Sequence, residues 1–156
     1  VREMIEEQAA SLAALRATAE DVEKLEAALA EMATEKKNRE QFAQADLRFH
    51  LALAEATHNE LFVLLLNPVT DLLLDLMAHL STLPSAPEQA LWHHRQILRH
   101  IKCGEAEQAR QAMHAHLSQF AKRLKKYEAT HQSITKSATG KSDTQKASRS
   151  SRKTKP

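Results

Sequence analysis

Apolar residues recur every three or four positions through most of the chain, and this spacing restricts it to amphipathic helices. One stretch places Val22, Leu25, Leu29 and Met32 along a single face, shortly after Thr18, which can cap the helix. Only two of the 156 residues are glycine and four are proline, while helix-forming residues dominate. Aromatic residues, which strands favour, make up 4%. The sequence therefore predicts an all-α protein.

Six helical segments follow from the apolar spacing and from residues that start and stop helices. The first covers about residues 1–17, with Val1, Ile5, Ala9 and Leu12 on one face. The other five are expected at about residues 18–34, 38–57, 59–80, 85–103 and 105–127, and Asn38 can cap the third. Their short connections favour antiparallel neighbours. We therefore expect an antiparallel bundle of these helices, which forms one domain over residues 1–130.

The charge of the chain is divided unevenly. The net charge is +2, but residues 136–156 contain seven Lys or Arg and one acidic residue. This segment shows no apolar periodicity, so it cannot bury enough surface to offset its ordering entropy. We expect residues 131–156 to form a disordered basic tail that is solvated or makes sequence-independent contacts to phosphates.

The sequence gives no sign of a membrane segment or of export. Cys103 is the only cysteine, so a disulfide within the chain is excluded. The longest apolar stretch, residues 61–80, is interrupted by Asn67, Pro68 and two aspartates. The first residues are amphipathic and acidic, unlike a signal peptide. These features indicate a soluble, cytoplasmic protein.

Four residues of metal-ligand type fall on helix faces that are otherwise apolar. Asp46 and His50 lie one turn apart on the third segment, His94 lies on the fifth and His116 on the sixth. A buried carboxylate without a partner is unfavourable, and a cation among these groups would neutralise it. Nitrogen and oxygen ligands without thiolate suit zinc, nickel, iron or manganese. The pattern therefore indicates a metal site between three helices.

Two alternatives remain open from the residues alone. An inward-facing histidine is more often a hydrogen-bonded core residue than a ligand, which would make the protein a metal-free structural bundle. An ion with an open position can also activate water, which would make it a metal-dependent enzyme acting on small acids. No further Asp or Glu on the inward faces is evident as a general base. The sequence therefore favours a binding protein that is not an enzyme.

The order and spacing of the ligand-type residues resemble a known family. Asp46-x-x-x-His50, His94 in HHRQIL and His116 in AMHAHL are similar to the pattern of the FCD domain. This is the effector-binding C-terminal domain of FadR-subfamily GntR transcription regulators. The stretches VREMIEEQAASLAALRATAEDVEKLEAAL, FHLALAEATHN and GEAEQARQAMHAHL are also similar to the family. The resemblance covers residues 1 to about 127, and it implies an antiparallel bundle of six to seven helices.

The resemblance implies a ligand set and a cofactor. In many members of the family an Asp and three His hold a divalent ion, often zinc or nickel. By motif match these ligands are Asp46, His50, His94 and His116, the four residues that the helical faces select. The resemblance thus implies a resident metal ion.

The resemblance also implies an effector and partners. A small organic acid binds beside the ion in the family, and its carboxylate is held by the ion and by polar side chains. Candidate effector-binding residues are Arg2, Arg16 and Asn59, although Asn59 is also placed to cap a helix. The family further implies a homodimer that contacts DNA only through an N-terminal winged helix-turn-helix domain, which is missing from this chain.

Overall fold

The computed structural model describes the backbone of residues 2–150 and the side chains of residues 2–68 and 74–129. Within this part the chain forms helices and no strand, which confirms the all-α prediction. The helices are α1 (Arg2–Arg16), α2 (Ala19–Thr34), α3 (Arg39–Glu55), α4 (Glu60–Leu80), α5 (Ala86–Lys102) and α6 (Ala106–Ser150).

Three helices begin at the capping residues that the sequence predicts. The Thr18 side chain accepts a hydrogen bond from the Asp21 amide, and the Asp21 carboxylate accepts one from the Thr18 amide. Asn38 and Asn59 accept hydrogen bonds from amides in the first turns of α3 and α4. These caps fix where α2, α3 and α4 start, and hence which side chains face inward.

Helix α5 is bounded by two residues with left-handed backbone. Ser85 precedes it with φ 60° and makes no capping hydrogen bond through its side chain, although the sequence places the helix start there. Pro87 stands in the first turn, where its fixed φ suits a helix. Gly104 follows the helix with φ 71°, a conformation that glycine adopts without strain. The predicted limits of this helix are confirmed.

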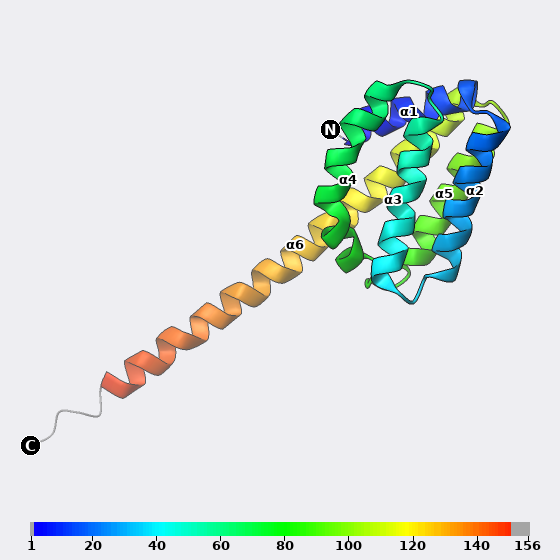
Figure 1. Ribbon diagram of the computed structural model, residues 1–156. Coiled ribbons are helices and arrows are strands. Elements are labelled where there is room, and N and C mark those ends of the chain that lie inside the picture. The colour runs from blue at the N-terminus through cyan, green and yellow to red at the C-terminus, as the bar shows by residue number, and fades with distance from the viewer. Residues whose placement is uncertain (1, 151–156) are drawn as a thin grey trace, which may run out of the picture. The chain divides into compact units, whose positions relative to one another are not determined.

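The residues up to Phe120 form one compact unit with α3 at its centre. Helix α3 packs against α2 and α4, and α2 also packs against α5. Successive helices from α2 to α5 alternate in direction, whereas α1 crosses one end of them and contacts α3, α4 and α5 (Figure 1). The unit is therefore an antiparallel helical bundle with a crossing first helix.

The core of this unit lies where α2, α3, α5 and the first part of α6 meet. Its largest fully buried apolar side chains include Leu25, Met32, Phe49, Leu53, Ile97 and Met113. Burying a side chain of this size stabilises the fold by about 1.5–3 kcal/mol. The polar residues described below lie inside this apolar surrounding, so each of them needs a partner.

Helix α1 buries a different face from the one predicted. The fully buried residues include Ala9, Ala10 and Ala13, whereas Ile5 and Leu12 are only half-buried. Alanines allow the helix backbone to come close to its neighbours, and this close approach decides the orientation. The same face carries Glu6, one turn before Ala9 and Ala10, and buries it completely.

Helix α4 is rich in leucine and leaves part of its apolar surface uncovered. Leu61, Leu64 and Leu65 are 54–67% exposed. Among the described residues, no helix combines the length and the hydropathy that crossing a membrane requires.

Helix α6 continues beyond the bundle unit. Residues from Ala121 onward form a second unit, and the backbone is helical as far as Ser150. The predicted disordered tail, residues 131–156, falls on positions whose side chains lie outside the described residues. Its disorder stays a prediction.

Candidate metal centre

Three buried histidines from three helices meet in the core. His50 comes from α3, His94 from α5 and His116 from α6, and one ring nitrogen from each lies within 4.8 Å of the others. Asp46 lies one turn before His50, and its Oδ1 is 3.3 Å from Nε2 of His94. The structure therefore brings together the four residues that the sequence selects as metal ligands.

The ring of His94 is fixed from its far side. Its Nδ1 donates a hydrogen bond to the carbonyl oxygen of Ala90 at 2.7 Å, and the edge of the Phe49 ring packs against it. Burial lowers the pKa of His94 to about 4, an effect that Asp46 opposes and His50 reinforces. Near pH 7 the ring is neutral, with its proton on Nδ1. The lone pair of Nε2 therefore points at Asp46 and His50.

The ring of His50 faces a carboxylate on its far side. Its Nδ1 lies 2.5 Å from Oε2 of Glu6, and both side chains are completely buried. The distance is that of an ion pair, although the angle is not that of a hydrogen bond. An ionised carboxylate offers only electron pairs, so a neutral His50 carries its proton on Nδ1. Its Nε2 lone pair then also faces the centre.

With these tautomers, the Nε2 lone pairs of two imidazoles and the carboxylate of Asp46 face one another. The two Nε2 atoms of His50 and His94 are 3.3 Å apart, and the carboxylate of Asp46 lies 3.3 Å from the second of them. Two nitrogens bound to one divalent ion at about 2.0–2.1 Å lie about 2.8–3.4 Å from each other, whether their angle at the ion is octahedral or tetrahedral. The donor set and its spacing fit a divalent cation.

The third histidine completes this set. The ring of His116 lies 4.5 Å from that of His94 and 5.2 Å from that of His50, between centroids. Burial lowers its pKa well below the usual value, and the neighbouring histidines lower it further. His116 is thus also neutral near pH 7, which is the form in which imidazole binds metals.

Glu6 is a buried acid that the sequence analysis missed. The expectation that no further Asp or Glu is evident on the inward faces was wrong, because the face predicted for α1, with Val1, Ile5, Ala9 and Leu12, leaves Glu6 out. The spacing of Glu6 to Ala9, Ala10 and Ala13 is the signal that could have found it. Burial alone raises the pKa of Glu6, but His50 and then Arg2 more than compensate and lower it to about 2.

Of the three candidate effector residues, Arg2 lies beside the centre. Its Nε and Nη2 donate to the two oxygens of Glu6, the second bond being 3.3 Å long. Its guanidinium also lies over the ring of Phe120, 5.4 Å from the centroid. Arg2 therefore reaches the histidine cluster through Glu6.

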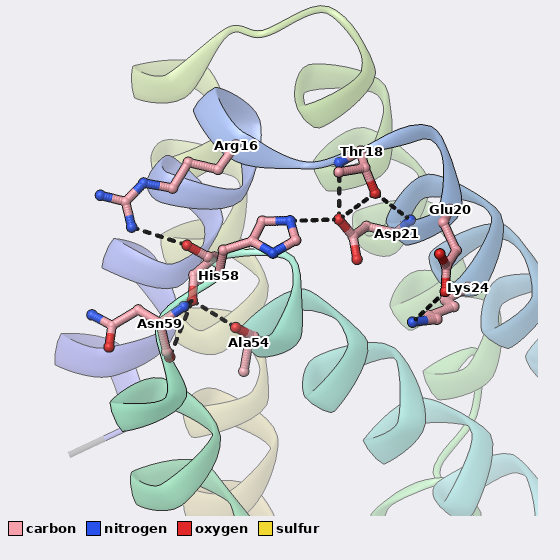
Figure 2. Close-up of polar contacts among 9 residues, drawn as sticks. Arg16, Thr18, Glu20, Asp21, Lys24, Ala54, His58 and Asn59 are labelled. Atoms are coloured by element: carbon pink, nitrogen blue, oxygen red, sulfur yellow. Dashed lines mark hydrogen bonds and ion pairs between the residues drawn. The ribbon is translucent and has the colours of Figure 1, made fainter.

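Arg16 and Asn59 lie at the turn between α3 and α4 (Figure 2). Arg16 donates to the carbonyl oxygen of Thr57 at 3.0 Å, and Asn59 caps α4. In the same turn His58 has φ 50°, and its Nε2 lies 2.9 Å from Asp21 at the start of α2. These contacts hold the turn in place, and within the described residues none of them joins Arg16 or Asn59 to the histidine cluster.

Comparisons with known proteins find related sequences. A family model described as the FCD domain matches residues 1–119. The chain is 37% identical to the HTH-type transcriptional regulator LutR of Bacillus subtilis (strain 168) over 123 residues, 76% of this chain and 56% of LutR. It is 35% identical over 142 residues to the putative L-lactate dehydrogenase operon regulatory protein of Escherichia coli (strain K12), 86% of this chain and 54% of that protein.

A solved structure has the same fold. Streptococcus agalactiae GntR matches with a TM-score of 0.65 at 23% sequence identity, covering 80% of this chain and 55% of that one. At this identity the likeness concerns the fold alone. The chain spans about half the length of the curated relatives it matches.

The pKa shifts of the buried histidines predict that the metal-free protein loses stability in mild acid. Below pH 6.5 the unfolded chain binds protons at His94 and His116 that the folded chain does not, so the free energy of unfolding falls as the pH drops towards about 4. We expect a loss of about 2 kcal/mol for His94 alone between pH 7 and pH 5. Urea denaturation in the presence of a chelator measures it.

A matched control separates the buried histidines from an exposed one. The variant His79→Gln removes an exposed histidine of α4 and should keep the full pH dependence. Below pH 4.5 Glu6 adds to the loss with the same sign, because its pKa is lowered to about 2. A free energy of unfolding that stays constant or rises from pH 7 to pH 5 would contradict the account.

Proposed function

Because the chain belongs to the FCD domain family, we propose that it is the effector-sensing domain of a GntR-family transcription regulator. The family is regulatory and the relatives are named as regulators, so the chain is not an enzyme. In our proposal the domain binds a divalent metal ion together with a small organic acid, and this binding controls DNA binding in the cytoplasm.

The observation that carries the proposal is the convergence of electron pairs in the core. Asp46, His50, His94 and His116 offer one carboxylate and three imidazoles within a buried cluster. A cation compensates their mutual repulsion, whereas the metal-free alternative leaves it uncompensated. With nitrogen and oxygen ligands and no thiolate, zinc or nickel is the ion that we propose.

The acid is proposed from the chemistry of such a centre. A divalent ion with four protein ligands can bind a carboxylate in a remaining position, and Arg2 supplies a positive charge nearby. One relative is named for an L-lactate dehydrogenase operon, which supports a small hydroxy acid such as lactate as the effector. The roles of Arg16 and Asn59 in binding it stay predictions.

The link to DNA follows from which helices hold the ligands. The four ligands come from α3, α5 and α6, and Glu6 reaches them from α1, so a bound acid acts on four helices together. It changes DNA affinity only through its different affinity for two helix arrangements. In our proposal a winged helix-turn-helix domain outside these 156 residues contacts the DNA.

A homodimer is the proposed assembly. Leu61, Leu64 and Leu65 are spaced to share one face of α4, and more than half of each is exposed. A second copy that covers this face would bury them, and a two-fold dimer matches a palindromic operator. The exposed leucines support this surface as the contact.

Metal and acid binding are tested together. We expect wild-type protein, purified without chelator or nickel resin, to contain about one zinc or nickel ion per chain by mass spectrometry and then to bind L-lactate in calorimetry. The His94→Ala variant should contain no ion and should show no heat of L-lactate binding. The His79→Ala variant, which removes an exposed histidine, should keep both the ion and the heat of binding. A wild type that takes up neither ion, even after zinc or nickel is added, would exclude the metal site.

A single charged substitution tests the proposed dimer surface. Leu64→Glu places a carboxylate in the middle of the exposed leucines and should turn a dimer into a monomer in light scattering. Trp92→Glu, on an exposed apolar residue of α5, should leave the dimer intact. A monomeric wild type, or a Leu64→Glu variant that remains dimeric, would refute this surface.

A further inference from the structure

We propose that Glu6 is a positioning residue of the metal centre, which fixes the ring and the tautomer of His50 and thereby ties α1 to the ion. This inference rests on the metal site proposed above. Glu6 is not one of the four proposed ligands, and its helix, α1, contributes none of them.

The contacts of Glu6 reach in two directions. Its side chain is completely buried, with Arg2 of the same helix donating to both oxygens. Its Oε2 also lies 2.5 Å from Nδ1 of His50, across the contact between α1 and α3. Arg2 thus orients the carboxylate, and the carboxylate in turn faces the ring of His50.

An ion pair formed only for stability does not require this second contact. Arg2 and Glu6 form their salt bridge one turn apart on α1, without help from α3. The carboxylate nevertheless meets the one nitrogen of His50 that is not aimed at the centre. A carboxylate on the far nitrogen of a ligating histidine fixes the ring, sets the tautomer and raises the basicity of the metal-bound nitrogen.

The ring of His94 also has a partner on the nitrogen that faces away from the centre. There the far nitrogen is held by the carbonyl oxygen of Ala90, so the partner of that nitrogen comes from the same helix, α5. His50 depends instead on Glu6 from α1. The positions of α1 and of the ligand ring are therefore coupled, and Arg2 links the same carboxylate to the proposed acid site.

The test compares two neighbouring carboxylates of α1. Glu6→Gln removes the charge opposite His50, while Glu7→Gln removes the same charge one residue later, where it pairs with Arg110 and His114. Zinc affinity is measured by competition with a chromophoric chelator. We expect Glu6→Gln to weaken zinc binding at least 10-fold, within the range of about 10–100-fold for such partners. Glu7→Gln should stay within about twofold of wild type.

The metal-free protein gives a second readout. Nitrogen NMR of the histidine rings should show His50 protonated on Nδ1 in the wild type, and shifted towards Nε2 in Glu6→Leu. A role of Glu6 in stability alone would not set this tautomer. If the leucine variant does not fold, the wild-type spectrum still decides, because a proton on Nε2 of His50 overturns the inference.

The outcomes separate this inference from the proposed function. If Glu6→Gln binds zinc as tightly as Glu7→Gln, the positioning role is overturned and the metal site stands. If the wild type binds no ion, the metal function fails. In that case the NMR spectrum still tests Glu6: a proton on Nδ1 that moves in Glu6→Leu supports its hold on His50, and any other result overturns it.

Discussion

The arrangement of the bundle depends on electron pairs that meet inside an apolar core. The Nε2 atoms of His50 and His94 stand 3.3 Å apart, and the carboxylate of Asp46 approaches at the same distance from His94. Such groups repel each other in a medium that screens charge poorly. In our proposal a cation converts this repulsion into attraction and joins the three helices that carry these residues. The proposed sensor function follows from this one condition.

The surroundings of the centre hold each donor in the required state. A backbone carbonyl keeps the proton of His94 on its far side, and Glu6 is placed to do the same for His50. Burial lowers the pKa of His94 to about 4, so its ring stays neutral and able to bind a metal near pH 7. Helix α1 can bring Glu6 this close because its inner face is made of alanines. The small side chains of α1 and the chemistry of the centre are thus parts of one arrangement.

The sequence predicted the helices and the inward ligands but not the partner of His50. Thr18, Asn38 and Asn59 are local signals, since a cap depends on residues within one turn. Asp46 and His50 stood out because their apolar neighbours mark the inner face of α3. Glu6 did not, because alanine is a weak marker of burial and the rotation of α1 is decided by its packing on other helices. Contacts between helices, unlike caps, carry no local pattern.

X-ray absorption spectroscopy at the zinc edge of the zinc-loaded protein tests the central claim most directly. The account predicts a first shell of nitrogen and oxygen at about 2.0–2.1 Å, with outer-shell scattering from three imidazoles and no sulfur. A spectrum with sulfur at about 2.3 Å would place the ion on Cys103. That spectrum, or one with fewer than three imidazoles, would contradict a centre formed by Asp46, His50, His94 and His116.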